Sequence, residues 1–177
     1  MLLSVHQRYM LELLRNVGCL RRDQLRKMLQ QHFQQEDLHI TENRLDAMLR
    51  QLRNFVGSVR LEGDLVRLDN VKPDDSWLEA LDVMLELAGG APPHYKARLP
   101  PPLLLRFILD DDTSNIFDVA KWQDRTTAAP MLARQGSQRV IWLADNAESI
   151  GGVLPPGQFL AVRQQDGTHR FYGSSGS

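Results

Sequence analysis

The sequence predicts an α+β protein built from two modules. Its first third carries apolar residues at helical spacing and ends in two short alternating runs, and the remainder alternates between strand-like and helix-like segments. Formal charge divides at the same place, because residues 1–72 carry a net +3 and residues 73–177 a net −4. We therefore expect one domain over 1–72, a second over 73–172, and a flexible tail over 173–177.

Composition excludes several classes of protein. With 42% hydrophobic and 24% charged residues among 177, the chain is neither disordered nor collagen-like. A single cysteine precludes an intramolecular disulfide, and the five histidines show no zinc-binding spacing. No apolar run reaches the roughly 20 residues that cross a bilayer, and the N-terminus lacks a basic segment typical of a signal peptide. We expect a cytoplasmic protein with no membrane partner.

Three amphipathic helices are predicted first. Ser4 with Gln7 forms a capping-box start for the first helix, Gly18 ends it, and Thr41 caps the third. The residues expected to face the core are Val5, Tyr9, Met10, Leu13, Leu14 and Val17, then Leu25, Met28, Leu29 and Phe33, then Leu45, Met48, Leu49, Leu52 and Phe55.

A β-hairpin follows the helices. Ser58–Leu61 and Leu65–Leu68 alternate, and Glu62-Gly63-Asp64 between them is typical of a tight turn. Three helices followed by a hairpin resemble a winged helix-turn-helix domain, over about residues 3–70. This resemblance implies that the third helix is a recognition helix.

The outward side of that third helix has the chemistry of a DNA-reading surface. Arginine pairs with guanine and asparagine with adenine in the major groove, and a small residue permits close approach. Residues around the second helix supply cations for phosphates. The predicted DNA-binding residues, with Asn43 and Arg50 the foremost, are Asn43, Arg44, Ala47, Arg50, Gln51, Arg53, Asn54, Arg21, Arg22 and Lys27. The expected partner is double-stranded DNA.

A second interpretation stays open for this module. A net +3 is modest, and the hairpin tip carries Glu62 and Asp64, which disfavour a phosphate contact. Winged helices also serve as protein-docking or dimerisation modules, so a protein-interaction module that does not bind nucleic acid is the alternative.

The second module is predicted as a helix, three strands, a helix and further strands. Pro73 and the acidic residues beside it mark the boundary. The segments, in chain order, are a helix that is capped by Ser76 or Asp75 and runs to Ala88, strands Tyr95–Leu99, Leu103–Leu109 and Ile116–Trp122, a helix Asp124–Gln135, strand Arg139–Ala144, and a hairpin of Gln158–Gln164 with His169–Tyr172.

This order resembles the restriction-endonuclease-like core of αβββαβ type. The whole chain is similar to the replication-relaxation proteins of plasmids and mobile elements, and closer to an uncharacterised bacterial family of the same layout. The stretches that carry the resemblance are Leu104–Ile108, Ile116–Val119, Arg139–Leu143 and Gly167–Tyr172. It implies a role in plasmid or mobile-element maintenance, mobilisation or transcriptional control.

The nuclease chemistry of that superfamily is not expected here. An active member needs an Asp and an Asp/Glu-x-Lys on adjacent strands to hold a metal. Asp118 and Lys121 are three residues apart, so they point to opposite faces of a strand, and Asp110–Asp112 is typical of a solvated turn. No phosphate-binding loop, GxSxG or HExxH motif is present.

We therefore predict a non-enzymatic DNA-binding protein without cofactor or metal. The acidic second domain would serve as a scaffold for dimerisation or for docking another protein. A divergent metal-dependent nuclease is the remaining alternative.

Overall fold

The chain folds into two compact units. A computed structural model describes residues 2–36, 39–109, 115–134 and 139–173. The units are Met1–Leu78 and Glu79–Ser177. Leu78 belongs with the first unit because it packs with Cys19 and Val71, and because its carbonyl oxygen accepts a hydrogen bond from the buried Gln24 side chain at 2.7 Å. The sequence placed this boundary earlier, at 72/73.

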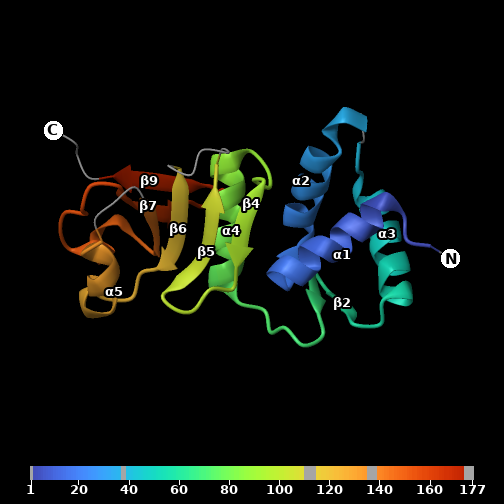
Figure 1. Cartoon of the computed structure of the whole chain (residues 1–177), viewed down its shortest axis with the longest axis horizontal. Coiled ribbons are helices and arrows are strands. Elements are labelled where there is room, and N and C mark those ends of the chain that lie inside the picture. Colours follow the sequence, from blue (N-terminus) through green and yellow to red (C-terminus); the bar gives the residue numbers. More distant parts are fainter. Residues whose placement is uncertain (1, 37–38, 110–114, 135–138, 174–177) are drawn as a thin grey trace. The chain divides into compact units, whose positions relative to one another are not determined.

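The first unit contains three helices and a three-stranded antiparallel sheet (Figure 1). The predicted helices and hairpin are present. In chain order the elements are α1 (Val5–Val17), β1 (Cys19–Arg21), α2 (Arg22–His32), the 3-10 turn η1 (Gln34–Glu36), α3 (Glu42–Phe55), β2 (Val59–Glu62) and β3 (Leu65–Leu68).

Local sequence determines where the helices of this unit begin and end. The Ser4 hydroxyl accepts from the Gln7 amide while the Gln7 side chain accepts from the Ser4 amide, which is the predicted capping box. Gly18 closes α1 with φ +79°, a conformation that favours glycine. The Thr41 hydroxyl accepts from the Arg44 amide and so caps α3.

Strand β1 was not predicted. It follows Gly18 directly and pairs with β3, so the sheet order is β1-β3-β2. Three residues are too short for a recognisable alternation, and only pairing with β3 makes them a strand. Two predicted core residues are also displaced, since Val5 and Phe55 are about half exposed. Both lie in a terminal turn of their helix.

The second unit is built on a six-stranded mixed sheet whose strands lie side by side in chain order (Figure 1). Strands β6, β7 and β8 are parallel, and every other neighbouring pair is antiparallel. The elements are α4 (Asp75–Ala88), whose first four residues belong to the first unit, β4 (His94–Ala97), β5 (Leu103–Ile108), β6 (Ile116–Lys121), α5 (Arg125–Leu132), β7 (Arg139–Ala144), η2 (Ala147–Ile150), β8 (Gln158–Arg163) and β9 (His169–Gly173). The chain is thus a mixed α+β protein, as predicted.

Helices cover both faces of this sheet. Helix α5 packs over the face that contains Trp142 and Leu160. There the buried Gln158 amide donates to the Met131 carbonyl oxygen and accepts from the Trp142 indole, each at 2.9 Å. Helix α4 lies against the other face, where its carboxylates contact His169.

Helix α5 and the C-terminal segment differ in extent from the prediction. Helix α5 ends at Leu132, with Asp124 as its N-cap, whereas the sequence carried it to Gln135. Residues 135 and 174–177 of the predicted helix and tail lie outside the described residues, but Gly173 belongs to β9. No helix in the described part of the chain is long and apolar enough to cross a membrane.

A fully buried carboxylate lies in the middle of the sheet. Asp118 on β6 is 0% exposed and accepts two hydrogen bonds from Arg106, its cross-strand partner on β5, at 2.6 and 3.0 Å. Arg134, which follows α5, donates a third at 3.1 Å. Arg106 and Arg134 therefore compensate the buried negative charge of Asp118. The hydrogen bond to the Asp118 carboxylate raises the pKa of Arg106.

A second buried charge cluster joins α4 to β9. Both ring nitrogens of His169 lie within hydrogen-bond distance of carboxylates, Nδ1 at 2.9 Å from Glu86 and Nε2 at 3.1 Å from Glu79. A ring that donates at both nitrogens is the imidazolium. Burial alone lowers the pKa of His169, but the hydrogen bonds to the two carboxylates outweigh it and raise that pKa above its ordinary value.

We expect Arg106→Ala to destabilise the second unit more than Asp118→Asn. Removing Arg106 leaves a fully buried carboxylate with one cation, at a cost of about 3 kcal/mol or more. Asp118→Asn leaves two arginines whose guanidinium groups still reach water, at a cost of about 1–2 kcal/mol. Urea unfolding followed by the fluorescence of Trp122 and Trp142 measures both costs, and the reverse order would contradict this interpretation of the cluster.

The His169 cluster predicts a stability that depends on pH. Because the folded-state pKa is raised, the stabilisation is complete below the ordinary pKa of 6.5 and is lost as pH rises through the folded value. His169→Gln should cost about 1.5–3 kcal/mol below pH 6.5, and the difference from the unmodified protein should shrink at alkaline pH. Thermal unfolding across a pH series measures it, and a difference that is constant with pH would disprove the charged state of His169.

Candidate functional site

Helix α3 presents a polar face to solvent. Its apolar residues Leu45, Leu49 and Leu52 are fully buried, so the opposite side of the helix faces outward. All seven DNA-binding residues predicted on this helix are exposed; these are Asn43, Arg44, Ala47, Arg50, Gln51, Arg53 and Asn54. The structure therefore brings this part of the predicted site together on one element.

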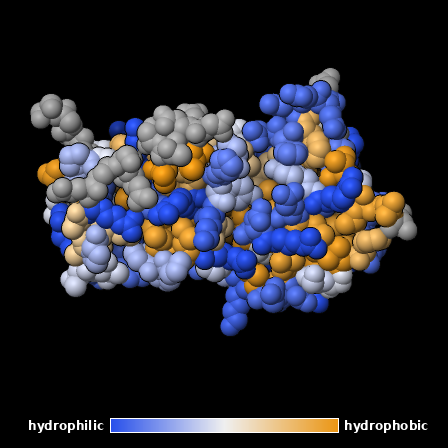
Figure 2. All heavy atoms as spheres, in the orientation of Figure 1, coloured by the Kyte–Doolittle hydropathy of each residue, from blue (hydrophilic) through white to orange (hydrophobic). Residues whose placement is uncertain are grey.

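Helix α1 holds the middle of α3 through one buried polar side chain. The Gln7 amide nitrogen donates to the Met48 carbonyl oxygen at 3.3 Å and to the Gln51 side-chain oxygen at 3.1 Å. Because its side-chain oxygen accepts this hydrogen bond, Gln51 helps to hold α3 against α1 in addition to its predicted contact with DNA. The polar surface over α2 and η1 is visible in the same unit (Figure 2).

Asp46 binds two of the predicted cations at once. One of its carboxylate oxygens accepts from Arg22 at the start of α2, and the other accepts from Arg50 one turn further along α3, at 2.5 Å. The hydrogen bond from Arg22 is the main reason that the pKa of Asp46 lies below its ordinary value, and Arg50 adds to the effect. The carboxylate is therefore charged at neutral pH.

Other cations of α2, and Arg21 just before it, are also paired with carboxylates. Arg26 contacts Glu42 at the start of α3, and Asp23 contacts both Arg21 at 3.2 Å and Lys27 at 3.8 Å. These ion pairs leave few cations available to an outside anion. Within the described residues, Arg44 and Arg53 are the predicted site cations that make no ion pair.

The β2–β3 hairpin uses its arginines internally. Arg67 binds the Glu62 carboxylate at 2.5 and 3.0 Å and also donates to the carbonyl oxygens of residues 68, 69 and 71. Arg60 donates to the Gly57 carbonyl oxygen at 2.6 Å. The hydrogen bond to Arg67 lowers the pKa of Glu62, and the pKa of Arg67 is raised. These contacts agree with the expectation that the hairpin is a poor phosphate clamp.

The strand residues considered for metal binding do not converge. Asp118 is fully buried between Arg106 and Arg134, whereas Lys121 is exposed. Strand β6 pairs with β7 residue by residue over both positions, and the register shift in its pairing with β5 lies in β5, between Leu103 and Leu105, so β6 itself stays regular from Asp118 to Lys121. Asp110–Asp112 lies outside the described residues. Among the residues that are described, no three His, Cys, Asp or Glu side chains are grouped for a metal.

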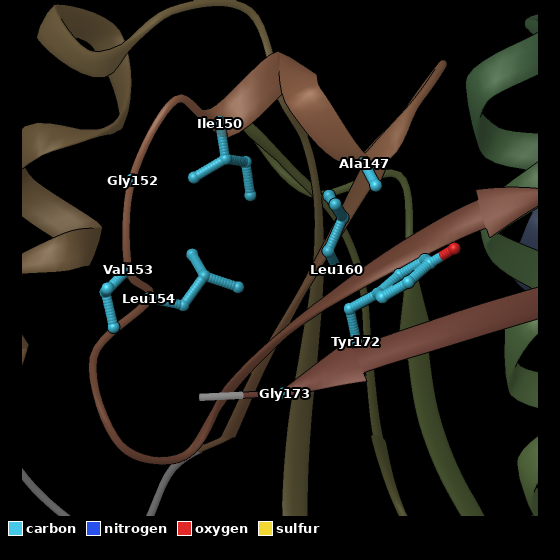
Figure 3. Close-up of a pocket in the computed structure, with 8 residues that line it drawn as sticks. All are labelled: Ala147, Ile150, Gly152, Val153, Leu154, Leu160, Tyr172 and Gly173. Atoms are coloured by element: carbon cyan, nitrogen blue, oxygen red, sulfur yellow. The ribbon is translucent and has the colours of Figure 1, made fainter. Parts of the chain in front are cut away.

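The second unit has a small open pocket, lined mainly by apolar side chains, beside the edge strand β9 (Figure 3). Its volume is about 230 Å³, and its lining comes from η2, the loop after it, β8 and β9. Ile150, Leu154 and Leu160 point into it, while the Tyr172 hydroxyl points away from Ile150 and Leu154. Among the described lining residues, Tyr172 alone has a polar side-chain group, so the described lining holds no acid–base or nucleophilic pair.

The ion pairs around the polar face of α3 were not predicted from the sequence. The spacing of Asp46 and Arg50, four residues apart on one helix, is a sequence signal for their pair. The contact of Asp46 with Arg22 has no such signal, because it joins two helices. The same holds for His169 with Glu79 and Glu86, and for Asp118 with its two arginines.

A comparison of the chain with models of known protein families gave no match, and a comparison with curated proteins gave none either. A function must therefore be inferred from the described residues themselves.

Proposed function

We propose that the first unit is a winged helix-turn-helix domain that binds double-stranded DNA with α3 as its recognition helix. The observation that carries this proposal is the exposed polar face of α3, opposite a fully buried apolar stripe. The order α1-β1-α2-α3-β2-β3 with sheet order β1-β3-β2 supports it, because a short strand after the first helix completes the sheet of a winged helix.

The residue types on this face suit a major groove. The guanidinium of Arg50 matches guanine O6 and N7, and the amides of Asn43 and Asn54 match adenine N6 and N7. Ala47 lies between them on the same face and allows the helix axis to approach the base edges. These four residues are the candidates for base contacts.

Phosphate contacts would come from the cations around this face. Arg44 and Arg53 are available without breaking an ion pair in the described structure, whereas Arg21, Arg22 and Lys27 must first exchange a carboxylate for a phosphate. Binding by one domain is therefore weak and sensitive to salt, since each phosphate contact releases counterions. A second copy of the chain on a paired half-site would supply the remaining affinity.

The second unit fits the role of a non-enzymatic scaffold. Its order α4-β4-β5-β6-α5-β7 agrees with a restriction-endonuclease-like core, and the engagement of Asp118 by two arginines supports the inference that this carboxylate holds no metal. We infer an accessory or regulatory role for the protein, with the acidic unit serving dimerisation or docking. We propose plasmids or mobile elements as the setting of that role, which is what the resemblance to replication-relaxation proteins implies.

DNA binding should fall steadily with salt. If Arg44 and Arg53 alone reach phosphates, log K against log salt should have a slope of about −2, and recruitment of further cations should make it steeper. Fluorescence anisotropy of a labelled random-sequence duplex at several salt concentrations measures this slope. Absence of binding at the lowest salt would exclude the DNA-binding proposal in favour of a protein-interaction module.

Arg50→Ala should weaken binding to a selected DNA site by about 1–3 kcal/mol, because it removes a base contact. Arg15→Ala is the matched control, since Arg15 is an exposed arginine in the last turn of α1 and is not among the predicted DNA-binding residues. The site is obtained by selection from a random library, and affinity is measured by anisotropy. Equal affinities of the two variants would remove Arg50 from the interface.

A further inference from the structure

Asp46 lies within the face that is proposed to meet DNA, where a negative charge opposes binding. It is one turn before Arg50 on α3, and its side chain is 28% exposed. A carboxylate in this position repels every phosphate that approaches the adjacent cations. A stabilising role in the fold does not by itself explain why a carboxylate occupies this face.

The geometry of the Arg22–Asp46–Arg50 cluster separates a fixed partner from a movable one. Arg22 is the more sheltered arginine, with a side chain that is 24% exposed, while that of Arg50 is 67% exposed. The backbone N–H of Arg22 also donates to the Asp64 carbonyl oxygen at 2.9 Å, which ties the start of α2 to the hairpin turn. Asp46 is thus anchored through Arg22, and Arg50 is the partner that extends into solvent.

The hydrogen bond to Asp46 leaves most of the Arg50 guanidinium available. Arg50 donates to Asp46 through Nη2 alone, and a guanidinium has five N–H donors, of which guanine takes two. Arg50 can therefore keep its contact with Asp46 while it reads guanine. A phosphate at the same guanidinium brings a full negative charge close to the Asp46 carboxylate, whereas a guanine edge carries only partial charges.

We propose that Asp46 is a specificity-determining residue, which orients Arg50 toward a base edge and disfavours contact with phosphate. This inference rests on the DNA-binding function proposed above. Asp46 weakens the contacts with phosphate, which lowers the affinity for DNA of any sequence, but it leaves the contact of Arg50 with guanine intact. It therefore increases the difference in affinity between a matching site and other sequences. Removing its charge trades that selectivity for general affinity.

Asp46→Asn tests the proposal on a probe without guanine. The probe is an alternating dA–dT duplex of about 20 base pairs, or two helical turns. The variant should bind this duplex about three- to tenfold more tightly than the unmodified protein at low salt, and its salt slope should be steeper by about 1–2, because Arg50 and Arg22 both lose the carboxylate that holds them. Selection from a random library should give a consensus in which guanine is less strongly preferred.

Three matched variants control this experiment. Asp46→Glu keeps the charge and should retain the preference for guanine that Asp46→Asn weakens. Glu42→Gln removes a carboxylate that pairs with Arg26 instead, so it should leave the preference for guanine unchanged. In an Arg50→Ala background, the effect of Asp46→Asn on the guanine preference should disappear, as coupled residues require. Circular dichroism melting of each variant verifies that the first unit is folded.

Two results would overturn the proposal, and they are distinguishable. If the unmodified protein binds the duplex and a folded Asp46→Asn variant has the same affinity, salt slope and guanine preference, Asp46 does not determine specificity while DNA binding stands. If neither protein binds any duplex at low salt, the DNA-binding function itself fails, and the role of Asp46 fails with it.

Discussion

Burial of the apolar stripe of α3 is the constraint on which the candidate site depends. Leu45, Leu49 and Leu52 are all fully buried, and burial of three leucines contributes several kcal/mol, about 1.5–3 for each. Since side chains on a helix are fixed in direction relative to one another, this burial dictates that the opposite residues face water. The Gln7 contacts with Met48 and Gln51 then fix the helix against α1. The polar face is therefore rigidly presented.

Charge on that face is balanced locally. The net +3 of residues 1–72 suggests free cations, yet Asp23, Glu42 and Asp46 each hold one or two of the basic side chains of α2 and α3. The exposed ion pairs among these contribute little to stability, about 0.2–1 kcal/mol each. The basic side chains can therefore leave these ion pairs to contact a partner. Asp23, Glu42 and Asp46 determine how much free energy that exchange costs. Net charge alone is a poor guide to the affinity of such a surface.

The second unit uses buried charge to fix its architecture. Asp118 joins β5, β6 and the end of α5 through two arginines, and His169 joins β9 to α4 through two carboxylates. Each cluster satisfies a charge whose burial would otherwise be costly. Asp118 and His169 are side chains of the types that bind metals or act in catalysis. Here their hydrogen bonds connect the strands and helices of the unit. The proposed scaffold role of this unit rests on these contacts.

The sequence by itself determined the helices of the first unit, the hairpin, nearly every strand of the second unit and the outward residues of α3. Helical periodicity, caps such as Ser4 and Thr41, and turn residues such as Gly63 are local properties, so a linear sequence contains them. Only the tertiary structure decided that β1 is a strand, that Leu78 belongs to the first unit, and that Arg22 meets Asp46. These features depend on contacts between segments far apart in the chain, and no local pattern specifies which cation a carboxylate will bind.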